Sequence, residues 1–280
     1  GYRHDVEKLG PAVNAMMLVG HNTIRSLEMG NERRAPRDGE LERMREHIGL
    51  AMEQGACGFS TGLIYRPGRW SDTEEVLELA KAVAPFDGIY ATHMRNENDH
   101  LLEAVDEALD IGSKAGVAVQ ISHHKAAGKR NWGKVKESLA KVDAAVAEGA
   151  RVTLDVYPYT AGSGPMIQYF DLKNPNPELA QAIQLASCPA FRDYEGRMLV
   201  DIAAELQITA PEVVRHILTA PHGKQTICIQ HTMDEGDILS NLRHDRVMIG
   251  SDGIPDLGGR PHPRLYGTFP RVLGRYVREQ

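Results

Sequence analysis

One unit repeats along this chain and constrains its fold more than any other feature: a short apolar run, a polar loop, an amphipathic stretch and a glycine. The apolar runs predict strands at residues 14–20, 56–60, 88–93, 117–122, 151–156 and 246–251. The amphipathic stretches predict helices, among them residues 40–54, 101–114 and 134–148, which are followed by Gly55, Gly116 and Gly149. This alternation indicates parallel strands joined by right-handed crossovers.

A series of this kind closes into a (β/α)8 barrel or stays open as a doubly wound sheet. No GxGxxG or GxxxxGK[ST] loop follows any of the runs, which disfavours a nucleotide-binding sheet. Reactive polar residues instead follow several runs, at the strand ends where barrel enzymes build their sites. We therefore favour an α/β fold of the barrel type, although the main series supplies six strands and a barrel needs eight.

Residues 157–245 interrupt the repeat. They contain the Pro- and Asn-rich segment "LKNPNPELA", helix-like stretches at residues 193–206 and 209–218, and a further apolar run at residues 225–230. We interpret this region as an insertion between the last two strands of the series, in a position to act as a lid over the site. Residues 1–280 are expected to belong to one barrel domain, with residues 157–245 as its insertion.

The composition excludes several classes of partner. The net charge is −6 and no long basic run occurs, so neither nucleic acid nor an anionic membrane surface is an expected partner. No apolar run approaches the roughly 18 residues that a membrane span needs, and no signal peptide is visible. Cys57, Cys188 and Cys228 are few and widely spaced, which favours a reducing, cytoplasmic compartment. The sequence leaves the oligomeric state open.

Three strand ends carry groups that suit a metal. His93 ends one run, with Arg95 and Glu97 just beyond it, while His123 follows a second run and Asp252 a third. Two imidazoles and a carboxylate at one mouth of a barrel would suit a zinc ion with a water beside it. Taken singly, each histidine fits an ordinary hydrogen-bonding role, and "SDG" around Asp252 is also a turn signal.

In the stretch "SHHK", successive side chains of an extended segment point to opposite sides, so His123 and His124 do not face the same way. We expect His123 to be the ligand. Lys125 then lies on the same side as His123, and with Tyr157 and Ser163 of "DVYPYTAGS" it suggests a clamp for a carboxylate. A solvated lysine and a tyrosine packed at the rim of the core are equally good interpretations.

Two further strand ends are less specific. Tyr65 in "GFSTGLIYRPG" is expected to line a pocket, although a packing role suits it as well. His21 and Arg25 in "GHNTIR" are expected to support the site from behind and not to bind the metal directly.

Seven segments together resemble the D-aminoacylase (N-acyl-D-amino-acid deacylase) family of the amidohydrolase superfamily. They occur in order from His21 to the C-terminus and cover nearly the whole chain. They are "VGHNTIR", "GFSTGLIYRPG", "THMRNE", "ISHHKAAGKRNWGK", "DVYPYTAGS", "IGSDG" and "HPRLYGTFPRVLGRYVRE". The fourth and the seventh are long and specific, whereas "GSDG" alone is weak.

The resemblance implies a zinc hydrolase on a distorted (β/α)8 barrel that splits N-acyl-D-amino acids into a carboxylate and a free D-amino acid. It implies that His93 and His123 are the metal histidines of the fifth and sixth strands and that Asp252 of the eighth strand handles the proton. It also implies substrate-binding roles. Lys125, Tyr157 and Ser163 would hold the α-carboxylate, and Tyr65 would line the side-chain pocket.

This sequence departs from the family pattern in its metal ligands. The family has an HxH motif on its first strand and a metal-binding cysteine on its second, but no HxH occurs here, and Cys57 lies where the fourth strand is expected. The resemblance therefore implies the central part of a barrel, without its first two strands and without the small β-sandwich that flanks it. The region 157–245 would then lie between the seventh and eighth strands.

Three alternatives stay open. An N-acyl-D-glutamate or N-acyl-D-aspartate deacylase would need a second basic residue in the side-chain pocket, for which Arg264 and Arg151 are candidates. Another cyclic or linear amide could be the substrate. A truncated, inactive homologue could act as a binding module, and the missing HxH and cysteine favour that interpretation.

Overall fold

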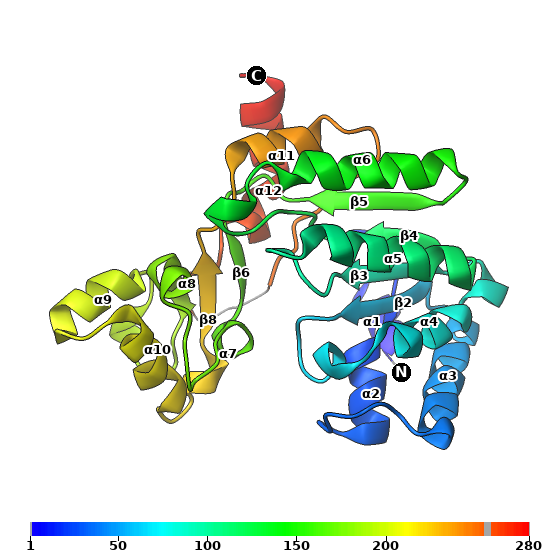
Figure 1. Ribbon diagram of the computed structural model, residues 1–280, viewed down its shortest axis with the longest axis horizontal. Coiled ribbons are helices and arrows are strands. Elements are labelled where there is room, and N and C mark those ends of the chain that lie inside the picture. The colour runs from blue at the N-terminus through cyan, green and yellow to red at the C-terminus, as the bar shows by residue number, and fades with distance from the viewer. Residues whose placement is uncertain (1, 255–258, 280) are drawn as a thin grey trace.

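All six predicted runs pair side by side in one parallel sheet. The computed structural model describes residues 2–254 and 259–279, and its main sheet has the order β1-β2-β3-β4-β5-β9 (Figure 1). The strands are β1 (Leu18–Gly20), β2 (Gly58–Gly62), β3 (Ile89–His93), β4 (Ala118–Ile121), β5 (Val152–Val156) and β9 (Val247–Ile249). The predicted α/β class and its parallel series are thus confirmed.

The sheet is open within the described residues. β1 pairs only with β2, and β9 pairs only with β5, so these two strands are its edges. The sequence predicted a barrel without its first two strands, and no closure into a barrel is seen among the described residues. Strand pairing shows six consecutive parallel strands whose carboxyl ends meet at one edge of the sheet, which is enough to bring distant residues together.

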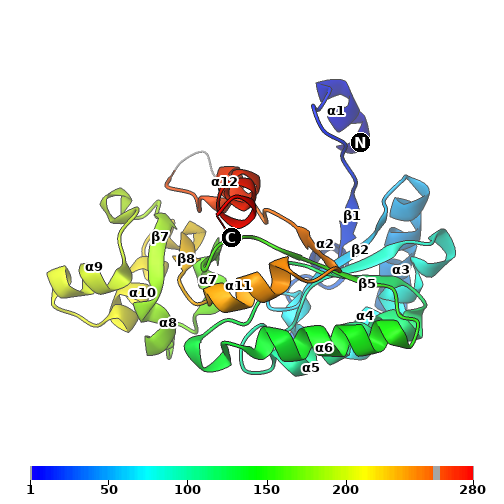
Figure 2. The same cartoon turned by 90° about the horizontal axis from the view of Figure 1, so that it is seen from above.

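Helices connect the strands of the main sheet, and α4 (Thr73–Lys81), α5 (Leu101–Ala115) and α6 (Lys134–Ala147) lie alongside one another over one face of it (Figures 1 and 2). Local chemistry sets their ends. The Asp72 carboxylate accepts a hydrogen bond of 2.8 Å from the backbone N–H of Glu75 at the start of α4. Gly116 ends α5 with φ of 72°, a conformation that glycine adopts freely. The helices are α2 (His21–Met29), α3 (Asp38–Glu53), α4 (Thr73–Lys81), α5 (Leu101–Ala115), α6 (Lys134–Ala147) and α11 (Glu235–Leu242).

A second, smaller sheet was not predicted. β6 (Gly162–Pro165), β7 (Ile183–Ser187) and β8 (Ile227–Gln230) pair antiparallel in the order β6-β8-β7. With their helices they form what we call the small lobe, residues 162–230, which has its own apolar core and lies to one side of the main sheet (Figure 1). Those helices are α7 (Met166–Tyr169), α8 (Pro177–Gln181), α9 (Leu199–Leu206) and α10 (Ala210–Thr219).

Two boundaries differ from the sequence-based expectation. The predicted helix at residues 193–206 begins only at Leu199, because Gly196 adopts φ of 85° and interrupts it. Helix α11 lies inside the range 157–245 but packs against α6 and β9 of the main sheet.

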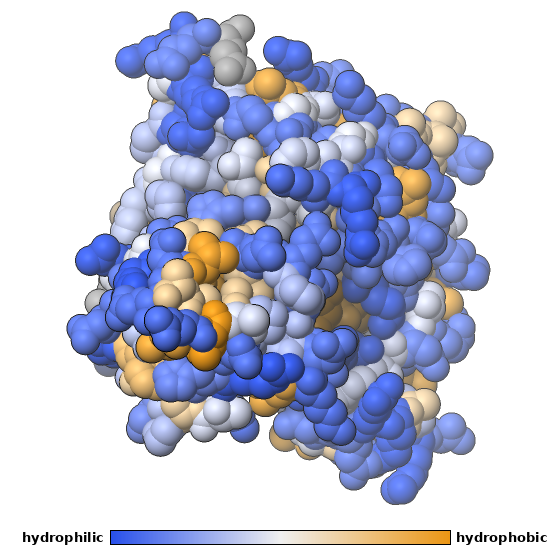
Figure 3. Space-filling view, turned by 60° about the vertical axis from the view of Figure 1, so that its left-hand side comes forward, coloured by the Kyte–Doolittle hydropathy of each residue, from blue (hydrophilic) through white to orange (hydrophobic). Residues whose placement is uncertain are grey.

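With the small lobe turned towards the viewer, apolar side chains gather on one part of an otherwise hydrophilic face (Figure 3).

The first and last helices of the chain lie in different places. Helix α1 (Tyr2–Leu9) stands off at the end of an extended segment, whereas α12 (Arg264–Arg271) lies across the molecule from α6 (Figure 2). Among the described residues, no helix is long and apolar enough to cross a membrane.

His21 and Arg25, which we expected behind the site, converge on a buried carboxylate. Glu75 Oε1 lies 2.8 Å from His21 Nε2 and accepts a hydrogen bond of 2.9 Å from Arg25 Nε. All three side chains are almost fully buried. This cluster ties α2 to α4, and no contact found among the described residues links it directly to His93 or His123.

Replacing Glu75 with alanine should destabilise the chain by about 3–5 kcal/mol, because Arg25 would remain buried without its partner. Urea denaturation measures this loss. The matched control is Glu78→Ala on the same helix, which breaks the more exposed pair with Lys81 and should cost about 1 kcal/mol or less. Equal losses for the two variants would contradict a structural role for the buried cluster.

Candidate active site

The ends of β3 and β4 bring two histidines into contact. Thr92 pairs with Ile121 in the parallel register, so His93 and His123 both emerge at the carboxyl edge of the sheet. His93 Nδ1 lies 2.9 Å from His123 Nε2, and the ring centroids are 4.4 Å apart. The structure thus brings together the two residues that the sequence indicated as metal ligands.

A tight turn directs His123 to this position. Its φ is 40°, in the left-handed region that side chains other than glycine seldom adopt. Asp155 on β5 holds the turn: its Oδ1 accepts from the His123 N–H, and its backbone carbonyl accepts from the His124 N–H, both at 2.8 Å. The strained backbone is therefore fixed by the neighbouring strand.

His124 points away from the site, as predicted, but the turn at His123 sets this direction, because β4 ends at Ile121. Its Nδ1 lies 2.7 Å from Asn241 Oδ1 and its Nε2 lies 2.8 Å from Ser138 Oγ. Asn241 also donates to the His124 carbonyl at 3.1 Å. His124 is fully buried, and burial lowers its pKa to about 4. It anchors the turn to α11 and α6 in its neutral form.

Glu97 joins the two histidines, and the sequence analysis did not assign it a role. Its Oε1 accepts from Lys125 Nζ at 2.6 Å and lies 3.0 Å from His123 Nδ1. Its Oε2 lies 3.6 Å from His93 Nε2. Lys125 Nζ is also 2.8 Å from His123 Nδ1, so the carboxylate and the ammonium group meet at the same imidazole nitrogen.

These surroundings keep His93 neutral and the carboxyl group of Glu97 ionised. Burial lowers the pKa of His93 to about 3, despite the nearby charge of Glu97. Burial alone would raise the pKa of Glu97, but the charge of the Lys125 ammonium and the hydrogen bond with His123 hold it well below its usual range. Neutral imidazoles and an ionised carboxylate are the protonation states that metal binding requires.

The donor set fits a zinc ion. His93, Glu97 and His123 have nitrogen or oxygen atoms that all lie within 4.8 Å of one another. Two imidazole nitrogens that face each other suit zinc, whose bonds to histidine are about 2.0–2.1 Å long. His93 Nε2 is buried, and no group in the part of the chain that the structure describes forms a hydrogen bond with it.

A second group of charges surrounds Tyr157. The Lys125 ammonium lies 5.7 Å from the centroid of its ring, and the Arg264 guanidinium lies 4.5 Å from it. Arg264 Nη1 pairs with Asp252 Oδ2 at 2.8 Å. Asp252 is therefore next to the cationic group and is not a member of the His93, Glu97 and His123 cluster. Its φ is 46°, which makes it a second site residue with a left-handed backbone.

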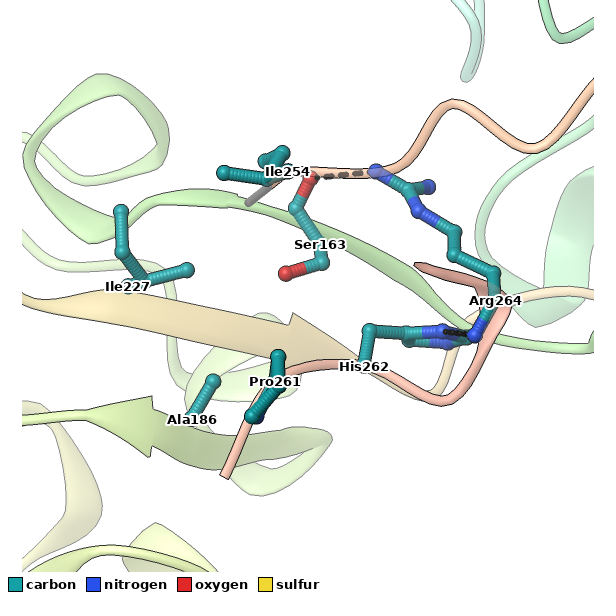
Figure 4. A pocket seen from close by; sticks show the side chains of 7 residues that line it. All are labelled: Ser163, Ala186, Ile227, Ile254, Pro261, His262 and Arg264. Carbon is teal, nitrogen blue, oxygen red and sulfur yellow. Dashed lines mark hydrogen bonds between the residues drawn. The ribbon is translucent and has the colours of Figure 1, made fainter. Parts of the chain in front are cut away.

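Ser163 of the small lobe reaches the same place. Its carbonyl accepts from Arg264 Nη2 at 3.1 Å, and its side chain lines a small cavity beside that arginine (Figure 4). Arg264 Nε is buried there and has no hydrogen-bond partner among the described residues. The other residues that line the cavity are Ala186, Ile227, Ile254, Pro261 and His262.

Tyr65 packs against the histidine pair, with its ring centroid 4.9 Å from that of His93. Burial raises its pKa, and the neighbouring Tyr169 and the carboxylates of Glu97 and Asp252 add to this effect.

Two residues considered in the sequence as a second carboxylate-binding cation and as a metal ligand, Arg151 and Cys57, lie away from the histidine pair. Arg151 precedes β5 at the opposite edge of the sheet, is exposed, and pairs with Asp87 at 2.8 Å. Cys57 precedes β2 at that same edge, and its thiol donates to the carbonyl of Met17. Neither belongs to the site.

No family model matches the chain. The sequence is 42% identical to D-aminoacylase from Alcaligenes xylosoxydans xylosoxydans over 96% of this chain and 52% of that protein. The chain is a homologue of the D-aminoacylases. It spans about half the length of the curated relatives that it matches.

Solved structures of D-aminoacylase relatives also match. The N-acyl-D-glutamate deacylase of Bordetella bronchiseptica, complexed with zinc and a phosphonate inhibitor that mimics the tetrahedral intermediate, is 36% identical with a TM-score of 0.90. The match covers 99% of this chain and 56% of that one. A D-aminoacylase with a binuclear metal centre is 40% identical with a TM-score of 0.85, over 96% of this chain and 54% of that one. These matches support the amidohydrolase fold.

The buried neutral His124 should make stability depend on pH. Its pKa is about 6.5 in an unfolded chain and about 4 in the fold, so between these values the unfolded state binds more protons and stability falls as the pH falls. His124→Gln should reduce this slope by up to about 1.4 kcal/mol per pH unit. Urea denaturation from pH 7 to pH 4, with a chelator present, measures it. An unchanged slope would show that His124 is charged in the fold.

Proposed function

We propose that this chain belongs to a zinc-dependent enzyme that hydrolyses the amide bond of N-acyl-D-amino acids, releasing a carboxylate and a free D-amino acid. One juxtaposition supports this proposal most: two facing imidazoles lie beside a group of cations suited to a carboxylate. An amide hydrolase for acylated amino acids needs these two features next to each other. Relatives at 37–42% identity are named for this reaction or for its variants with acidic substrates.

His93 and His123 would hold the zinc ion through the nitrogens that face each other. Bound zinc supplies Lewis-acid polarisation of the scissile carbonyl and lowers the pKa of water towards about 7. His93 suits this role because burial keeps it neutral. Tyr65, packed against His93, excludes solvent from one side of the pair.

Asp252 would move the proton. We assign it the role of general base towards the attacking water and then of general acid towards the leaving nitrogen. Arg264 holds Oδ2 of this carboxylate at 2.8 Å, and this orients the group. The left-handed backbone at Asp252 points to the same conclusion, because strained residues cluster at functional sites.

Lys125, Tyr157 and Ser163 would bind the substrate α-carboxylate, and Arg264 joins them. Two cations near one tyrosine ring, together with the unpartnered Nε of Arg264 beside the Ser163 side chain, form a site for a carboxylate. The cations would hold the α-carboxylate of the substrate, and the histidines would face its amide. With the carboxylate held in this way, only one enantiomer of the substrate places its amide at the histidines, so the site selects that enantiomer.

The position of Arg264 favours a substrate with a neutral side chain. Arg264 lies by the same tyrosine ring as Lys125, so we assign both cations to a single carboxylate. Arg151, the other candidate for a second carboxylate, is exposed and paired with Asp87 at the opposite edge of the sheet. An N-acyl-D-glutamate deacylase remains the second candidate, supported by the TM-score of 0.90 with such an enzyme.

Two further features belong to the proposal. The small lobe supplies Ser163 and one wall of the cavity beside Arg264, so we assign the inserted region a role in covering the substrate (Figure 4). Cys188 and Cys228 of the small lobe and Cys57 of the main sheet region are free thiols. Free thiols are consistent with a cytoplasmic enzyme.

An assay of the zinc-loaded chain on paired N-acetyl-D- and N-acetyl-L-amino acids tests the function. We expect release of the D-amino acid only, with N-acetyl-D-methionine hydrolysed faster than N-acetyl-D-glutamate. A preference for the acidic substrate would favour the second candidate. A zinc-loaded, folded chain that hydrolyses none of them would contradict the proposal and favour a binding module.

Asp252→Asn should lower the turnover number about 10²- to 10⁴-fold, because proton transfer by a positioned carboxylate contributes that much. Zinc content, measured by elemental analysis, should not change, since the residue lies outside the histidine cluster. His123→Ala is the control that should lose the zinc. Normal turnover in Asp252→Asn would exclude the carboxylate as the proton carrier.

A further inference from the structure

We infer that Glu97 is a positioning residue that sets the tautomers of both zinc-binding imidazoles and thereby the affinity of the chain for zinc. This inference rests on the proposed function, because it assigns the zinc to His93 and His123. It goes beyond that function by assigning a task to a carboxylate that contacts the outer side of the histidine pair.

The orientation of the two rings decides which nitrogens take the metal. His93 Nδ1 and His123 Nε2 face each other at 2.9 Å. A neutral imidazole has one nitrogen with a proton and one with a lone pair. For both facing nitrogens to offer lone pairs, the protons must lie on the outer nitrogens, His93 Nε2 and His123 Nδ1.

Glu97 is placed to accept the proton of His123 Nδ1, and its second oxygen faces the proton of His93 Nε2. Its Oε1 lies 3.0 Å from His123 Nδ1, and its Oε2 lies 3.6 Å from His93 Nε2, which has no hydrogen-bond partner. A carboxylate behind a metal-binding histidine fixes its tautomer and raises its basicity. Here one carboxylate faces both histidines, although the second contact is longer than a hydrogen bond.

Lys125 argues against Glu97 as a direct ligand. Its ammonium lies 2.6 Å from Glu97 Oε1 and 2.8 Å from His123 Nδ1, so a positive charge already occupies the outer face of the pair. A divalent ion at that face would be repelled by the ammonium. At the inner face, His93 Nδ1 and His123 Nε2 contact each other, and no cation of residues 2–254 or 259–279 is found bonded to either nitrogen.

Glu97 and Lys125 therefore act on His123 in opposite directions. A hydrogen bond from Lys125 to Nδ1 requires a lone pair there and moves the imidazole proton to Nε2, where it blocks the metal. Acceptance by Glu97 favours the proton on Nδ1 and leaves Nε2 free. By pairing with Lys125, Glu97 also limits the competing bond.

Zinc affinity of the purified chain, measured by competition with a chromophoric chelator, tests this inference. Glu97→Gln should weaken zinc binding about 10- to 100-fold. Glu97→Asp, which keeps the charge, should lie between that variant and the wild type. Lys125→Met should bind zinc at least as tightly as the wild type. Damage to packing alone would weaken binding in both the Glu97 and the Lys125 variants.

Glu107→Gln is the matched control. Glu107 is a carboxylate of similar burial that pairs with Arg95 at 2.8 Å, and none of its contacts with the described residues is with either histidine. We expect its zinc affinity to match that of the wild type. Circular dichroism of all four variants establishes that each is folded.

Nitrogen-15 NMR of the imidazoles in the zinc-loaded chain gives a readout that does not depend on activity. Protons on His93 Nε2 and His123 Nδ1 would support the inference. Zinc on those outer nitrogens would overturn it and make Glu97 a ligand. Wild-type affinity in Glu97→Gln would also overturn it, while leaving the proposed function intact. A wild-type chain that binds no zinc would overturn the proposed function itself.

Discussion

The parallel pairing of β3 with β4 is the constraint on which the site depends. Residues thirty positions apart meet only because Thr92 lies beside Ile121 in the register. A shift by one residue would reverse which side chains face the site, because alternate residues of a strand point to opposite faces. Register therefore decides that His123 meets His93 and that His124 is directed into the contact with α6 and α11.

Charge balance is the second organising principle. The site contains two cations and two carboxylates, and each cation has its own partner: Lys125 pairs with Glu97, and Arg264 pairs with Asp252. Pairing offsets the cost of removing such charges from water. The same two cations approach one tyrosine ring, so a substrate carboxylate would enter a region where Glu97 and Asp252 already compete for them.

The sequence predicted the main sheet well, because buried parallel strands are continuous apolar runs that are easy to recognise. It missed the small antiparallel sheet, since the residues of β6, "GSGP", have no strand signature. Among the site residues, His93, His123 and Lys125 were predicted from their positions at strand ends, and the structure brings them into contact. Their roles remain predictions.

Glu97 and Arg264 were harder to assign for physical reasons. Glu97 follows His93 by four residues in an irregular loop, where no periodicity indicates the direction of a side chain. Arg264 follows a segment rich in glycine and proline, so nothing in the sequence defines its distance from Asp252. Partners set by loop geometry cannot be derived from patterns that describe helices and strands.

The left-handed backbone shared by His123 and Asp252 has a consequence for how such a chain tolerates change. Glycine would relax the backbone at either position, so a selection for stability alone would favour the replacements that abolish the chemistry. The two positions most important to the proposed reaction are therefore among those where folding and function impose opposite demands on the choice of amino acid.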